Sequence, residues 1–146
     1  MLSDGVFVGV DVGSTTVKVA GLGAGGTITG DSVYVRLDEY ASQFDAVKSA
    51  LDSYLGSAGR PAVAGLGVTG SGRELTALML GADIGQSEIF AHAAGLNYLL
   101  KDGHVPDVST LGALIEIGGQ DSKLVCFDAD GTPAYFNMNT ICSAGT

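Results

Sequence analysis

The stretch of sequence that decides the fold is VFVGVDVGSTTVK, residues Val6 to Lys18. Apolar residues alternate with smaller or acidic ones in its first half, a pattern typical of a β-strand. Small and hydroxyl-bearing residues at 13–16 interrupt the alternation, and strand character then resumes. The stretch therefore predicts a β-hairpin with a polar tip, formed by strands at 6–12 and 17–22.

The tip of this hairpin offers groups that suit a nucleotide phosphate and its Mg²⁺. The tip consists of Gly13, Ser14, Thr15 and Thr16. Clustered backbone N–H groups bind anions, and hydroxyl and carboxylate oxygens suit Mg²⁺. Asp11 on one side supplies a carboxylate, and Lys18 on the other supplies an ammonium. Taken alone, the segment is explained equally well as a Gly-Ser turn with a solvated Asp and Lys.

Composition narrows the class of protein. The chain has 146 residues, a net charge of -9 and a pI near 4.3. Its length suits one domain, or one small domain plus part of another. An acidic surface argues against sequence-independent nucleic-acid binding. The N-terminus resembles no signal peptide and no apolar run is long enough to span a bilayer, so we expect a cytoplasmic protein without nucleic-acid or membrane partners.

The rest of the first half predicts a third strand and then a change to helical spacing. Residues 28–37 complete a three-stranded antiparallel meander. Apolar residues between 44 and 55 recur at helical intervals, with Ser42 as N-cap and Asp45 in the first turn. An apolar strand at 62–68 follows, and because it comes after a helix we expect it to be buried and parallel to its neighbour.

Two further helices are expected before a linker at 106–110. Ser71 and Glu74 have capping-box spacing, which predicts a helix that ends at Gly81. The turn 69–73 is either this helix start or an anion-binding loop. Apolar residues from 89 to 100 define the last helix, and His92 lies on or beside its apolar stripe. A packed histidine is the commoner case there, and a ligand is the alternative.

An internal repeat strengthens the functional interpretation of the first turn. In one ungapped register Glu116 aligns with Asp11, Gly118 with Gly13, Asp121 with Thr16, Lys123 with Lys18 and Gly131 with Gly26. Strands are expected at 111–117, which should be buried, at 122–127 and at 133–138. We therefore predict two related lobes, 1–104 and 105–146, each of which offers its turn to one ligand. The second lobe is expected to stop after three strands and a helix start.

The paired turns suggest a phosphate-handling site. Mg²⁺ would be bound through Asp11 and Asp121, with water between because Mg²⁺ dehydrates reluctantly. Gln120 and Asp121 are candidates to orient a hydrolytic water, and Glu116 ranks behind them. Further backbone donors would come from Gly118, Gly119 and Gln120. The sequence Gly-x-x-x-x-Gly-Lys-Ser/Thr is absent, which excludes a Walker-type loop.

The two cysteines are too few for a disulfide framework. Cys126 lies in a strand and is expected to be a small core residue. Cys142 is expected at a helix N-terminus, where the dipole favours a thiolate that can ligate a metal or act in redox chemistry. One cysteine cannot hold an iron–sulfur cluster, whereas a symmetric dimer could contribute identical thiolates to one.

Five motifs give the chain a family resemblance over its whole length. They are DVGSTTVK at 11–18, TGSGR at 69–73, EIFAHA at 88–93, EIGGQDSK at 116–123 and MNTICSAGT at 138–146. Together they resemble the activators of 2-hydroxyacyl-CoA dehydratases, a group that includes benzoyl-CoA reductase ATPase subunits. These proteins belong to the acetate and sugar kinase, Hsp70 and actin superfamily. The resemblance implies an α/β, RNase H-like (actin-like ATPase) fold, with a mixed sheet flanked by helices and a truncated second lobe.

The resemblance also implies an activity. An ATPase of this group is a homodimer with one 4Fe-4S cluster between its subunits, and ATP drives an electron from reduced ferredoxin or flavodoxin into a partner dehydratase or reductase. Asp11 to Lys18 and Gly118 to Asp121 would be the two phosphate elements, and Cys142 the first of two cluster cysteines per subunit. The second cysteine is expected after Thr146, which makes this chain an N-terminal part that is inactive by itself. A small-molecule kinase of the superfamily and a nucleotide-binding module without turnover are the alternatives.

Overall fold

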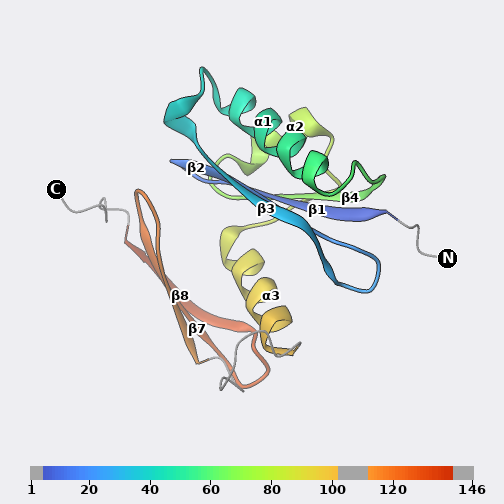
Figure 1. Ribbon diagram of the computed structural model, residues 1–146. Coiled ribbons are helices and arrows are strands. Elements are labelled where there is room, and N and C mark those ends of the chain that lie inside the picture. The colour runs from blue at the N-terminus through green and yellow to red at the C-terminus, as the bar shows by residue number, and fades with distance from the viewer. Residues whose placement is uncertain (1–4, 102–111, 140–146) are drawn as a thin grey trace. The chain divides into compact units, whose positions relative to one another are not determined.

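The computed structural model describes residues 5–101 and 112–139 (Figure 1). Contacts between residues divide the chain into two units, 1–86 and 87–146. Each unit is described by itself below. In the described part of the chain, no helix is both long and apolar enough to cross a membrane.

The first unit is built on a mixed five-stranded sheet. Its strands are β1 (Val6–Val12), β2 (Thr16–Leu22), β3 (Ile28–Arg36), β4 (Val63–Thr69) and β5 (Ile84–Gly85). Their order in the sheet is β3-β2-β1-β4-β5. The pairs β1–β2 and β2–β3 are antiparallel, which confirms the predicted meander, and β4 is parallel to β1 as predicted. The expectation that β4 is buried holds for Val68 but not for Val63, which is 47% exposed.

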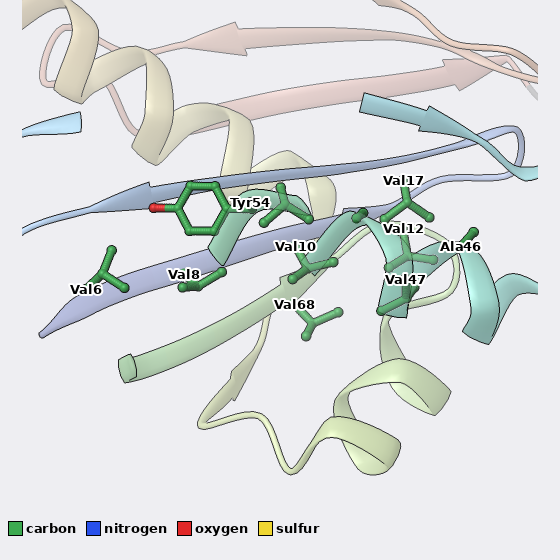
Figure 2. Close-up of a cluster of buried hydrophobic side chains, with 11 residues drawn as sticks. Val6, Val8, Val10, Val12, Val17, Ala46, Val47, Tyr54 and Val68 are labelled. Atoms are coloured by element: carbon green, nitrogen blue, oxygen red, sulfur yellow. The ribbon is translucent and has the colours of Figure 1, made fainter. Parts of the chain in front are cut away.

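The core of this unit lies between β1 and the helix α1 (Gln43–Ser57). Every second residue of β1 is buried, and Figure 2 shows these valines in one cluster with Ala46, Val47 and Tyr54 of α1. Burial of each valine contributes roughly 1.5 to 3 kcal/mol. The helix α2 (Arg73–Leu80) lies on the same face of the sheet as α1 (Figure 1), and its Ala77 packs against this core. The alternation leaves the intervening residues of β1, including Asp11, on the opposite face of the strand.

The two helix starts of the first unit differ in their capping. Ser42 caps α1 as predicted, because its Oγ accepts a hydrogen bond of 3.1 Å from the backbone N–H of Asp45. The predicted capping box of α2 is wrong. Its N-cap is Gly72 without a side-chain cap, and the Ser71 hydroxyl instead donates to the Val12 carbonyl at 3.5 Å. The backbone N–H of Gly72 donates to the same carbonyl at 2.9 Å, so the turn before α2 is tied to the end of β1.

The second unit places a helix on a three-stranded antiparallel sheet. Its elements are α3 (Glu88–Lys101), β6 (Ala113–Ile117), β7 (Ser122–Phe127) and β8 (Pro133–Asn139). Ala93 of α3 packs against Val125 and Phe127 of β7. The prediction that the strand at 111–117 is buried is wrong for its described residues. Ile115 and Ile117 are each 72% exposed. Strand residues alternate between faces, and these two share the face that does not carry Val125.

The contacts group α3 with the second sheet, whereas the sequence places this helix in the first lobe. The predicted division at residues 104 and 105 stays a prediction, because 102–111 lie outside the described residues.

The predicted register of the internal repeat agrees with the turns of both sheets. The turn after β2 has a hydrogen bond of 3.0 Å from the Gly26 N–H to the Gly23 carbonyl, and the turn after β7 has one of 3.1 Å from the Gly131 N–H to the Asp128 carbonyl. Gly26 and Gly131 have φ angles of 85° and 83°. This left-handed conformation favours glycine at both positions.

Gly21→Ala tests the packing of α1 on the sheet. A Cβ at Gly21 of β2 would overlap the buried hydroxyl of Tyr54 and lie 2.9 Å from Val6 Cγ2. We expect a loss of about 2 kcal/mol in the free energy of unfolding, because a well-packed core does not accept an added methyl. The measurement is urea denaturation. Gly56→Ala in α1 is the matched control: no described atom lies within 4 Å, and we expect a gain of about 0.5 kcal/mol. Equal changes in the free energy of unfolding for the two variants would contradict this packing of α1 on the sheet.

Candidate functional site

The first turn is a tight connection between β1 and β2. The backbone N–H of Gly13 donates to the Thr16 carbonyl at 2.9 Å. Asp11 and Lys18 lie opposite each other across the two strands, and the Lys18 Nζ is 2.9 Å from the Asp11 Oδ2. Their side chains are 27% and 51% exposed. The predicted carboxylate and ammonium thus flank the turn, and the half-exposed ammonium is open to solvent.

The end of β4 completes the surroundings of Asp11. Thr69 pairs with Asp11 in the parallel register, and Gly70 follows with a φ of 96°. A Cβ on Gly70 would overlap the Val12 carbonyl and lie 2.7 Å from the Asp11 Oδ1. Only glycine lets the backbone come so close to this carboxylate. The sequence singled out the turn 69–73 but did not show that Gly70 lies close to the Asp11 carboxylate.

An open pocket of about 450 Å³, lined by both polar and apolar residues, borders the first turn. Its lining includes Gly13, Ser14, Ser42, Gln43, Ser71 and Gly72. Hydroxyl, amide and backbone groups therefore lie beside the turn. The cavity gives the exposed hydroxyl of Ser14 and the N-terminal end of α1 access to a common volume.

The second turn has the same backbone geometry and a different charge arrangement. The Gly118 N–H donates to the Asp121 carbonyl at 2.8 Å, as Gly13 does to Thr16. The Lys123 ammonium lies 2.9 Å from the Asp121 Oδ1 and 3.0 Å from both the Glu116 Oε2 and the Glu88 Oε2. The Lys123 side chain is only 7% exposed. We call these four residues the Lys123 cluster.

Electrostatics keep Lys123 charged despite its burial. Loss of hydration lowers the pKa of the ammonium, but hydrogen bonds to Asp121, Glu88 and Glu116 outweigh this effect and raise the pKa above its usual value. A buried ammonium is stable only when carboxylates replace the water that it loses. Lys123 is therefore a cation at every physiological pH, and it holds three carboxylates together.

Of the remaining predicted residues, some lie in the described part of the chain and one lies outside it. Gly119 and Gln120 lie exposed in the second turn, next to Asp121. Cys142 lies outside the described residues. Cys126, expected in the core, is only partly buried in β7. In the described residues, no group of three or more His, Cys, Asp or Glu side chains is placed to ligate a metal directly. A hydrated Mg²⁺ held through water needs no such group, and the roles of these residues stay predictions.

Two members of the Lys123 cluster were not recognised in the sequence as part of a site. The repeat aligns Lys123 with Lys18, but nothing in the sequence indicates that Lys123 is buried. Glu88 is 35 positions away in the sequence, on α3, and only the packing of α3 on the sheet brings it to Lys123. No periodicity or spacing in the sequence links the two residues.

A mixed sheet with flanking helices and a polar turn after its first strand is the architecture of the actin-like ATPase fold, as predicted, and solved structures support it. The activator of the 2-hydroxyisocaproyl-CoA dehydratase from Clostridium difficile, with bound ADPNP, has a TM-score of 0.74 and 30% sequence identity over 94% of this chain and 47% of its own. Component A of the (R)-2-hydroxyglutaryl-CoA dehydratase from Acidaminococcus fermentans has a TM-score of 0.76 and 28% identity over 94% and 48%.

Sequence comparison gives the family. The profile of the BadF/BadG/BcrA/BcrD ATPase family matches residues 8–146, and the chain belongs to this family. The Escherichia coli (strain K12) protein YjiL is 32% identical over 142 residues, which are 95% of this chain and 48% of YjiL. The chain thus spans about half the length of these relatives. The family resemblance predicted from the five motifs is confirmed.

The two lysines of the repeat provide a matched test of the charge arrangements. Lys123→Met leaves three carboxylates without their common cation, and we expect the free energy of unfolding to fall by about 3 kcal/mol. Lys18→Met breaks a solvent-exposed pair and should change it by less than about 1 kcal/mol. Urea denaturation of both variants measures the difference. Equal losses would contradict the burial and pairing described for Lys123.

Proposed function

We propose that the protein is an ATP-dependent activator that transfers an electron to a 2-hydroxyacyl-CoA dehydratase-type partner, with this chain as its N-terminal part. Family membership and the likeness to two dehydratase activators, one with bound ADPNP, support the proposal. The observation that carries the nucleotide-binding part of the proposal is the duplicated turn. Each copy has a tight glycine hydrogen bond and a carboxylate–lysine pair at the same register position.

The first step is binding of ATP with Mg²⁺. Backbone N–H groups of the two turns donate to phosphate oxygens, apart from those of Gly13 and Gly118, which are hydrogen-bonded within their own turns. Lys18, half exposed and held by one carboxylate, is free to exchange Asp11 for a phosphate at little cost, because exposed ion pairs are weak. Asp11 and Asp121 accept hydrogen bonds from water bound to Mg²⁺. When bound, Mg²⁺ neutralises the charge that develops on the phosphates.

Hydrolysis then requires a positioned water. Gln120 and Asp121 are the proposed orienting residues, since phosphoryl transfer depends mainly on positioning and electrostatic stabilisation. Glu116 ranks behind them because it lies in the strand β6 and not in the turn itself. Gly70, which follows β4, lies against the Asp11 carboxylate and limits the space around it.

Asp11→Asn tests the phosphate assignment. The amide keeps the shape of the side chain but loses the negative charge that orients Mg²⁺-bound water, so we expect roughly tenfold weaker Mg²⁺-ADP binding and slower ATP turnover. Calorimetry and a phosphate-release assay on the full-length protein measure both. Asp52→Asn in α1 is the control, because Asp52 belongs to an exposed pair with Lys48 and its loss should change neither. Parent-like affinity and turnover in Asp11→Asn would show that the assignment is wrong.

The electron-transfer part of the proposal rests on the family resemblance. A 4Fe-4S cluster is held by about four thiolates, and it would supply the low-potential electron. Within the described residues Cys126 is the single cysteine, so the geometry there offers no cluster site. We propose Cys142 as one ligand in each subunit of a homodimer, together with a second cysteine. Reduced ferredoxin or flavodoxin is the proposed donor, and the dehydratase or a related reductase the acceptor.

Iron content tests this part independently of nucleotide binding. After anaerobic reconstitution of the full-length protein, we expect Cys142→Ala to lose most of its iron and its charge-transfer absorption while it still binds ADP. Cys126→Ala is the matched control and should keep the iron of the parent protein. A parent protein without iron would favour a small-molecule kinase or a non-catalytic module. Undiminished iron in Cys142→Ala would remove Cys142 from the cluster.

A further inference from the structure

The two lysines at the same position of the repeat have opposite environments. Lys18 is 51% exposed and pairs with one carboxylate. Lys123 is 7% exposed and pairs with carboxylates from three elements: Glu88 of α3, Glu116 of β6 and Asp121 in the second turn. Repeat symmetry alone would make Lys123 a second phosphate ligand. Its environment indicates a different task.

The ammonium of Lys123 has no donor left for a phosphate. An ammonium has three N–H donors, and three carboxylates lie at 2.9 to 3.0 Å from the Lys123 Nζ. To bind a phosphate, the side chain would have to leave at least one partly buried carboxylate without its cation, which is unfavourable. The pairing instead fixes one oxygen of Asp121 and one of Glu116, and so sets the direction of both carboxylates.

The net charges of the two turns also differ. Asp11 and Lys18 cancel, whereas the Lys123 cluster combines one cation with three anions. The second turn therefore favours a cation, and the first turn with its half-exposed ammonium favours an anion. This difference follows from Glu88 and Asp121, which have no acidic counterpart paired with Lys18 among the described residues.

We propose that Lys123 is a positioning residue that directs the carboxylates of the second turn toward hydrated Mg²⁺ and does not itself bind the nucleotide. The inference rests on the function proposed above. Without the ammonium, Glu88, Glu116 and Asp121 repel one another and separate. Asp121 then loses its fixed orientation, and the nucleotide loses the part of its affinity that depends on Mg²⁺.

The test compares ADP affinity with Mg²⁺ and with EDTA in the full-length protein. Loss of a residue that orients a metal-facing ligand typically weakens metal-dependent binding by roughly 10- to 100-fold. We expect Lys123→Met to lower the Mg²⁺-dependent gain in ADP affinity by at least about tenfold, while affinity in EDTA changes far less. Affinity per folded molecule is measured, so a purely structural loss leaves the gain unchanged. Asp52→Asn in α1 is the control and should keep the gain, because Asp52 belongs to an exposed pair with Lys48 outside both turns.

Three results separate the explanations. A parent-like Mg²⁺ gain in Lys123→Met would overturn the inference, and loss of ADP affinity in EDTA would instead make Lys123 a phosphate ligand. If the parent protein binds ADP under neither condition, the proposed function itself fails. Where Lys123→Met does not fold, the double variant Glu88→Gln/Lys123→Met removes one unpaired carboxylate to restore folding. The Mg²⁺-dependent gain in ADP affinity of this double variant should be as low as we expect for Lys123→Met. A parent-like gain in the double variant would equally contradict the inference.

Discussion

The alternation of side chains in β1 is the constraint on which the first turn depends. Val6, Val8, Val10 and Val12 must face α1 to form the core, so Asp11 must face the other way. The register of β1 against its neighbours then puts Asp11 opposite Lys18 on one side and Thr69 on the other. A shift by one residue would expose the valines and bury the carboxylate, which makes the alternative register strongly unfavourable.

The side chains of β7 in the second unit alternate in the same way, but here a lysine lies on the packed face. On β7 the residues Lys123, Val125 and Phe127 share a face, and α3 covers that face. Lys123 therefore lies on the packed side of its sheet. In the first unit, by contrast, Lys18 is half exposed. The same repeated hairpin thus carries a half-exposed cation at one turn and a set of carboxylates around a buried cation at the other.

Much of this arrangement could be predicted from local sequence. The alternating valines, Ser42, Gly81 and the repeat gave the strands, two helix ends and both turns. Ser71 and Glu74 failed as a capping box, because the strand end at Val12 competes for the Ser71 hydroxyl. Likewise, the apolar strand at 113–117 does not reveal which face is covered. Gly70 beside Asp11 and Glu88 beside Lys123 depend on long-range packing, and spacing in the sequence carries no signal for them.

We propose that the two repeat-related turns both take part in binding Mg²⁺-nucleotide. Backbone amide NMR during titration with Mg²⁺-ADP measures this for each turn separately. We expect the amide signals of 13–16 and of 118–121 to shift together, with one midpoint, while those of the exposed turn at 128–131 stay in place. Shifts confined to one turn, two separate midpoints, or no shift at either turn would contradict it.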